Sequence, residues 1–150
     1  MIVCANRPFG LHSVTRLIPV VALLAGCSDC LSPEDLVGEY SLVGFAGGTP
    51  PAIIHSQGGC TTRLDGGTLT IGNQGVIEIV LDEFIDCSAV GGPANEQGFT
   101  LTGTYEVDER TLDIVFYTDA DGTIMTHGEV SEDTIAVPLG LEVDPLIFER

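Results

Sequence analysis

The sequence contains no lysine and no tryptophan, and its only permanently positive side chains are five arginines, set against 22 aspartates and glutamates. The formal net charge of −17 at pH 7 repels the phosphates of nucleic acids and the anionic head groups of membranes. Both are therefore excluded as partners that bind through charge. An acidic surface of this kind keeps an exported protein soluble, and it attracts cations or basic partners.

The sequence also lacks an apolar run of the roughly 20 residues that a membrane-spanning helix needs. Its run over residues 17–24 has only eight residues and follows Arg7 and Arg16. A short apolar stretch behind positive charges is typical of an export signal rather than of a membrane span. We therefore expect residues 1–26 to be a signal peptide.

The end of this run resembles the lipobox of bacterial lipoproteins, because Leu24, Ala25 and Gly26 precede Cys27. The resemblance implies cleavage before Cys27 and a diacylglyceryl group on its sulfur. Two acyl chains, at about 0.8 kcal/mol per buried CH₂, anchor a protein to a membrane permanently. Ser28, where an aspartate would retain a lipoprotein at the inner membrane, implies the outer membrane, facing the periplasm or the surface. The alternative is an ordinary signal sequence followed by a coincidental cysteine.

Sequence signals for catalysis or metal binding are also missing. There is no nucleophile elbow, no phosphate-binding loop, and no histidine pair at zinc-ligand spacing. The segment 119–122 opens like a calcium loop, but position 12 of that loop would be Val130, which has no carboxylate. We interpret His127 as the outward partner of Asp113, and the acidic run 82–86 as a solvated rim. We therefore expect no enzymatic activity, no cofactor and no metal.

Five cysteines are present, and export changes how they are interpreted. Cys4 would leave with the signal peptide and Cys27 would be acylated. The remaining three are Cys30, Cys60 and Cys87.

A turn at 72–75 joins two apolar strands in a register that faces Ile71 with Ile77. A bulge at Gly66-Gly67 would insert one residue and bring Cys60 directly across from Cys87, within disulfide reach. We expect this disulfide, with unpaired thiols as the alternative.

Residues 99–117 alternate apolar and polar side chains on both sides of a polar turn, which predicts a β-hairpin with one buried face. A four-residue turn at 108–111 faces every apolar residue with an apolar partner or with a glycine that leaves room for a ring. The expected pairs are Val107 with Leu112, Tyr105 with Ile114, and Gly103 with Phe116.

The chain should form about eight antiparallel strands in an up-and-down meander, preceded by one short helical turn at Ser32-Pro33. Closing the meander into a small barrel removes both free edges, whereas an open two-layer sandwich is the alternative. Residues 46–59 and 86–97 are expected to be loops. The domain boundaries are a signal peptide at 1–26, a tether with the helical turn at 27–35, and the barrel at 36–150.

A short helical turn, then Gly38-Glu39-Tyr40-Ser41-Leu42, and strands ending in Phe148-Glu149-Arg150 resemble the lipocalin-like, or calycin, barrels. The similarity is greatest to the small lipocalin-like domains of bacterial lipoproteins. It implies that Tyr40 lies at the barrel floor, in the place of the family's tryptophan, and that Arg150 lies across it.

An eight-stranded barrel either just fills with side chains or holds one small ligand. We expect a small apolar ligand between the inward-facing residues Leu69, Ile79, Leu101, Tyr105, Ile114 and Phe116. The alternative is a filled barrel that serves as a structural or protein-interaction module of the cell envelope. An outward patch of Val115, Tyr117 and Met125 would then be a candidate contact for a protein partner.

Overall fold

The computed structural model describes residues 31–45, 48–118, 122–140 and 145–150. The lipobox and the calcium-like turn at 119–121 lie outside these residues. The described elements, in chain order, are α1 (Pro33–Leu36), β1 (Gly38–Phe45), β2 (Ala52–Gln57), β3 (Cys60–Ile71), η1 (Asn73–Gly75), β4 (Val76–Asp86), η2 (Ser88–Val90), β5 (Ala94–Asp108), β6 (Thr111–Tyr117), β7 (Thr123–Ser131), β8 (Thr134–Val137) and β9 (Leu146–Glu149).

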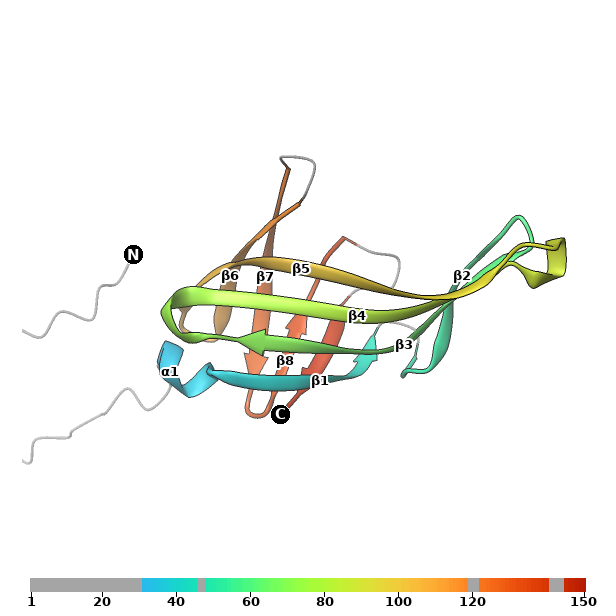
Figure 1. The fold of residues 1–150 in the computed structure, drawn as a ribbon. Helices are drawn as coiled ribbons and strands as arrows, with labels where there is room; N and C mark the ends of the chain where they lie inside the picture. The colour runs from blue at the N-terminus through green and yellow to red at the C-terminus, as the bar shows by residue number, and fades with distance from the viewer. Residues whose placement is uncertain (1–30, 46–47, 119–121, 141–144) are drawn as a thin grey trace, which may run out of the picture.

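Eight of the strands close into one antiparallel barrel (Figure 1). From β3 to β9 each strand pairs with the next, and β1 closes the ring by pairing with both β9 and β3. The expected meander and its closure are confirmed, and the open sandwich is excluded. β2 lies outside the ring, paired with β3.

The expected hairpin registers are also confirmed. Tyr105 pairs with Ile114 and Gly103 with Phe116, so the inward residues of β5 and β6 meet on one face. A Cβ atom added at Gly103 would lie 2.2 Å from the carbonyl oxygen of Val115. Glycine is therefore required where these two strands approach each other.

The helical turn α1 lies against one end of the barrel. Asp35 accepts hydrogen bonds from the hydroxyl of Ser32 at 2.8 Å and from its backbone N–H at 3.0 Å, and these bonds lower the pKa of Asp35. Leu36 is buried, and Leu31 packs against the core beside it. No helix in the described ranges is long and apolar enough to span a membrane.

Three barrel strands run on past the barrel and form an arm at the end opposite α1 (Figure 1). We define the arm as β2 together with residues 60–65 of β3, 82–86 of β4 and 94–100 of β5. These segments pair in the order β2, β3, β4, β5.

The arm corrects two expectations. Residues 46–59 were expected to be a loop, but 52–57 form β2. Residues 86–97 were also expected to be a loop, but only 87–93 connect β4 to β5. Both expectations were wrong because most side chains of β2 and all those of residues 94–100 are exposed on both faces, so no alternation of apolar and polar residues marks these two segments.

The disulfide between Cys60 and Cys87 is confirmed, and it joins β3 to the loop at the tip of the arm. The register of β3 on β4 shifts between Leu64 and Gly66, so Asp65 is the inserted residue. The bulge thus lies one residue before the expected position. It brings Thr61 opposite Asp86 and so aligns the two cysteines beyond them.

Candidate functional site

The barrel interior is packed with side chains. The six positions expected to line a ligand cavity all belong to one hydrophobic cluster, and none is more than 5% exposed: Leu69, Ile79, Leu101, Tyr105, Ile114 and Phe116. A small-molecule cavity of roughly 300 Å³ would leave its walls accessible to a water-sized sphere. The packing at these positions leaves no room for such a cavity.

The barrel floor brings the two ends of the described chain together. The guanidinium of Arg150 lies 4.8 Å from the centre of the Tyr40 ring and donates a 2.5 Å hydrogen bond to its hydroxyl. Arg150 also donates to the carbonyl oxygens of Asp35 at 3.1 Å and Val37 at 3.3 Å. Burial raises the pKa of Tyr40, and the positive charge of Arg150 opposes that rise. This arrangement stabilises the closed end of the barrel.

A hollow of about 450 Å³ opens to solvent at the same end, beside α1. Tyr105 reaches it from β5 and donates a 3.3 Å hydrogen bond to the carbonyl of Gly72. Burial raises the pKa of Tyr105, with the charge of Glu34 as a smaller cause in the same direction. The Tyr105 hydroxyl is thus held against the β3–β4 turn at the wall of this hollow.

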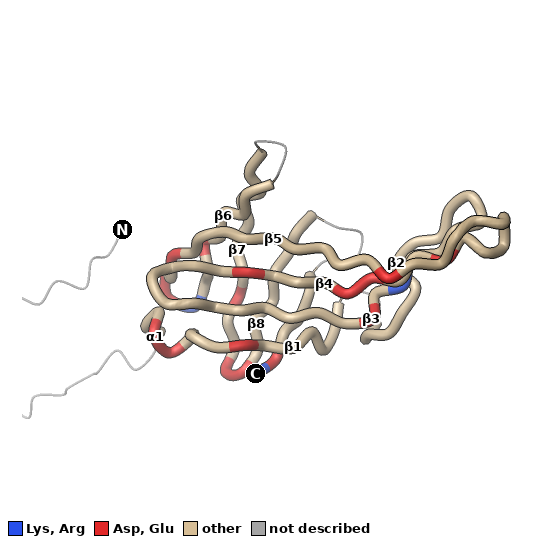
Figure 2. The backbone as a smooth tube through the Cα atoms, viewed as in Figure 1, with Lys and Arg blue, Asp and Glu red and all other residues tan. Residues whose placement is uncertain are grey.

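A second hollow, of about 410 Å³, lies on the arm. It is lined by Asp65, Asp82, Glu83, Glu96, Gln97 and Gly98. Figure 2 shows acidic positions on β4 where the arm leaves the barrel, with a basic position beside them. We name this feature the acidic hollow. Sequence reasoning identified Asp82 and Glu83 only as a solvated rim and missed the β5 residues.

The charges around the acidic hollow are not alike. Arg63 pairs with Asp65 and lies 4.9 Å from the ring of Phe84, and its hydrogen bonds lower the pKa of Asp65. Burial raises the pKa of Glu83. In the described residues, Asp82 and Glu96 have no ion-pair partner.

The expected patch of Val115, Tyr117 and Met125 lies on the outer face of the barrel. Val115 pairs with Met125 across β6 and β7. Met125 is 77% exposed and Tyr117 is 54% exposed. The patch is small, and its apolar side chains are interrupted by the threonines of β5, one of which lies 3.4 Å from the hydroxyl of Tyr117.

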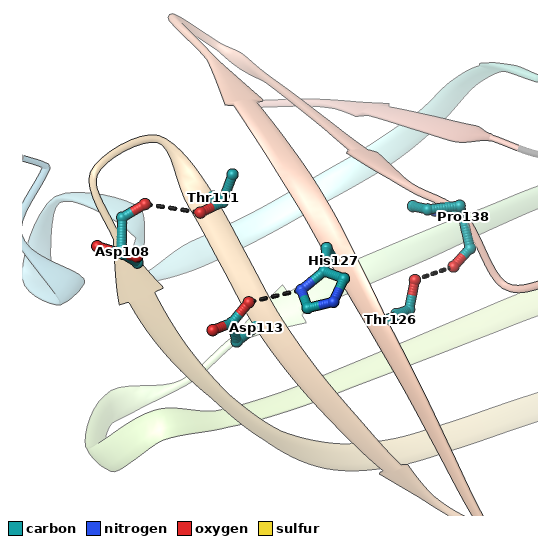
Figure 3. Close-up of polar contacts among 6 residues, drawn as sticks. All are labelled: Asp108, Thr111, Asp113, Thr126, His127 and Pro138. Atoms are coloured by element: carbon teal, nitrogen blue, oxygen red, sulfur yellow. Dashed lines mark hydrogen bonds and ion pairs between the residues drawn. The ribbon is translucent and has the colours of Figure 1, made fainter. Parts of the chain in front are cut away.

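His127 and Asp113 face each other across β7 and β6, with 2.6 Å between Nδ1 and Oδ1 (Figure 3). Both side chains are more than half exposed. The neighbouring Thr126 points away from this pair and donates to the carbonyl oxygen of Pro138 (Figure 3). The pair is therefore an isolated surface contact. Over the described ranges, no three histidine, cysteine or acidic side chains converge as metal ligands.

The arrangement thus offers a packed barrel, a floor held by Arg150, and an arm that carries unpaired carboxylates. The resemblance to lipocalin-like barrels stays a prediction, supported by the closed eight-stranded meander alone. Comparison with known proteins finds no matching family model, no matching curated protein and no matching solved structure.

Proposed function

We propose that this chain is a non-enzymatic, lipid-anchored protein of the bacterial cell envelope whose filled barrel holds the arm out toward a protein partner. The observation that carries the proposal is the packed interior. A barrel whose six expected cavity positions are at most 5% exposed has no room to carry an apolar molecule between them. Binding through the surface is then the function that the geometry supports best.

The proposed anchor would lie at the end of the molecule opposite the arm. Cys27 precedes Leu31 by four residues, and four extended residues span at most about 14 Å. The acylated cysteine would therefore stay close to α1, whereas the arm leaves the barrel at the other end (Figure 1). An outer-membrane anchor at Cys27 would leave the arm accessible to partners in the periplasm or at the surface.

Native mass spectrometry of the protein purified from its own membrane tests this proposal. We expect a mass that corresponds to a chain beginning at Cys27, with acyl groups and one disulfide, and with no further bound molecule. A Cys27→Ser variant should lose the acyl mass and membrane attachment. An apolar small molecule retained in the spectrum would contradict the filled barrel and favour carriage of a ligand.

A further inference from the structure

The segment 94–100 of β5 is a free sheet edge. These residues pair with β4 on one side, but pairing with β6 begins only at Thr102. In the part of the chain that the structure describes, no strand lies along their other side, and all seven residues are exposed. Such an edge presents unpaired N–H and C=O groups that another strand can pair with.

The other edge of the arm, on β2, is different. Both edge segments follow a proline, Pro51 before β2 and Pro93 before β5, but only the register of β2 on β3 shifts, between Ile53 and His55. Natural proteins protect sheet edges with prolines, bulges and lysines. The pairing of β5 with β4 has no shift from Thr104 to Ala94, and the segment 94–100 contains neither proline nor lysine. The arm therefore has one edge interrupted by a bulge and one edge with regular pairing.

The acidic hollow lies beside the regular edge, and its negative charge determines which kind of strand can bind at that edge. Asp82 pairs with Gly98, and a Cβ added at Gly98 would meet nothing within 4 Å. A long side chain from a neighbouring strand thus has space to cross Gly98 toward Asp82 and Glu96. A second copy of this chain would bring its own carboxylates to the same place, against a net charge of −17 on each molecule. A cationic strand would instead neutralise them.

We propose that an extended, basic segment of a partner protein adds to β5 at residues 94–100, with lysine or arginine side chains in the acidic hollow. The edge is roughly 23 Å long at about 3.3 Å per residue, so the segment has about seven residues. Alternate side chains of a strand share one face, and basic residues at every second position would face the hollow. This inference rests on the proposed function, because it names the partner that the arm binds.

The test uses the full chain and a fluorescently labelled nine-residue peptide that alternates lysine and threonine. We expect saturable binding by fluorescence anisotropy, together with slower amide hydrogen exchange at residues 94–100. The same peptide with glutamate in place of lysine should not bind. Two further peptides separate strand addition from charge attraction, one N-methylated at its odd-numbered residues and the other at its even-numbered residues. At least one should lose binding, because N-methylation removes backbone N–H groups that an added strand donates to β5. Retention of full binding by both methylated peptides would overturn the proposal.

Matched variants test the role of the hollow. Asp82→Asn with Glu96→Gln should weaken peptide binding by about tenfold or more. Glu39→Gln with Glu129→Gln removes the same charge from exposed positions on barrel strands and should leave binding nearly unchanged. Equal weakening by both pairs would overturn the proposal, as would a dimer formed through β5. If the peptide does not bind and native mass spectrometry shows no bound ligand, the proposed strand addition is wrong but the proposed function stands. A retained apolar ligand would contradict the proposed function itself.

Discussion

β5 belongs to both regions of the molecule, and it behaves differently in each. In the barrel, residues 101–108 alternate between buried and exposed positions, whereas every residue of 94–100 is exposed. The barrel half is stabilised by apolar side chains removed from water, at about 1.5 to 3 kcal/mol for each large one. Residues 94–100 depend on their hydrogen-bonded ladder with β4, and the rest of the arm adds one disulfide, the buried Leu64 and the contact of Arg63 with Phe84. The same strand is thus a structural wall at one end and an accessible edge at the other.

The largest expected effect tests this contrast with one substitution made in two places. Phe116→Ala removes a fully buried ring from the barrel and should cost about 3 to 5 kcal/mol of unfolding free energy. Phe99→Ala, at a ring 39% exposed where β5 enters the arm, should cost about 1 kcal/mol or less. Chemical denaturation measures both. Equal costs would contradict the contrast between a packed barrel and an exposed arm.

Removing the disulfide should cost almost as much as the buried ring. Cys60→Ser with Cys87→Ser opens a loop whose ends are 27 residues apart, and such a cross-link stabilises a protein by about 3 to 4 kcal/mol, mainly by restricting the unfolded chain. Hydrogen exchange should become faster throughout the chain because global unfolding becomes easier, and by a larger factor in the arm than in the barrel. Equal acceleration in the arm and around β6 and β7 would show instead that the two regions open only together.

Glu83 gives a smaller, pH-dependent effect at the junction of the two regions. Burial raises the pKa of Glu83 above its ordinary 4.5. At a pH between the ordinary and the raised pKa, the folded chain therefore binds more protons than the unfolded chain. Stability should therefore be lost as the pH rises through this window. Glu83→Gln should remove that loss and stabilise the protein near neutral pH by less than about 1 kcal/mol, because the side chain is partly solvated.

Urea unfolding between pH 4 and pH 8 measures this effect, with Glu96→Gln as the control on the neighbouring strand. Asp65 and Asp86 act in the opposite sense. Hydrogen bonds lower the pKa of each, so their contribution to stability is present above the ordinary value of 3.8 and is lost as the pH falls below it. A Glu83→Gln variant with an unchanged pH profile would show that the carboxyl is fully hydrated.

The smallest effect is expected on the outer face of the barrel. Asp113→Asn removes the charge partner of His127, but both side chains lie mostly in water. The change in unfolding free energy should be about 0.5 kcal/mol or less, and it should shrink at high salt. Thermal unfolding at two salt concentrations measures it, and His127→Gln is the matched variant. A cost above about 1 kcal/mol would mean that the pair supports the β6–β7 pairing more than exposed ion pairs usually do.

Most of the barrel was predictable from residue patterns, and the arm largely was not. Ile71, Leu69 and their partners on β4 repeat with a period of two, and only one register buries them all. The bulge was predicted within one residue because a cysteine pair and two glycines restricted the choice. The pairing of Glu96 with Phe84 had no such signal, because neither face of that segment is buried.

The candidate site was also predictable only in part. Tyr40 and Arg150 were placed together by a resemblance, and the structure brings them into contact. The ligand cavity was expected from strand number, but strand number sets only the width of a barrel. Side chains as large as Phe116 and Phe148, both with no exposed surface, decide how much of that width remains.

The sequence by itself determined the all-β class, the registers of the inward-facing hairpins and the disulfide, because burial of one face permits a single register. Only the tertiary structure decided between the closed barrel and the open sandwich, showed that the interior is packed, and showed that β5 leaves the barrel with a free edge. These features depend on contacts between strands that are far apart in the sequence. They also depend on side-chain volumes, which the alternation of apolar and polar residues does not reveal.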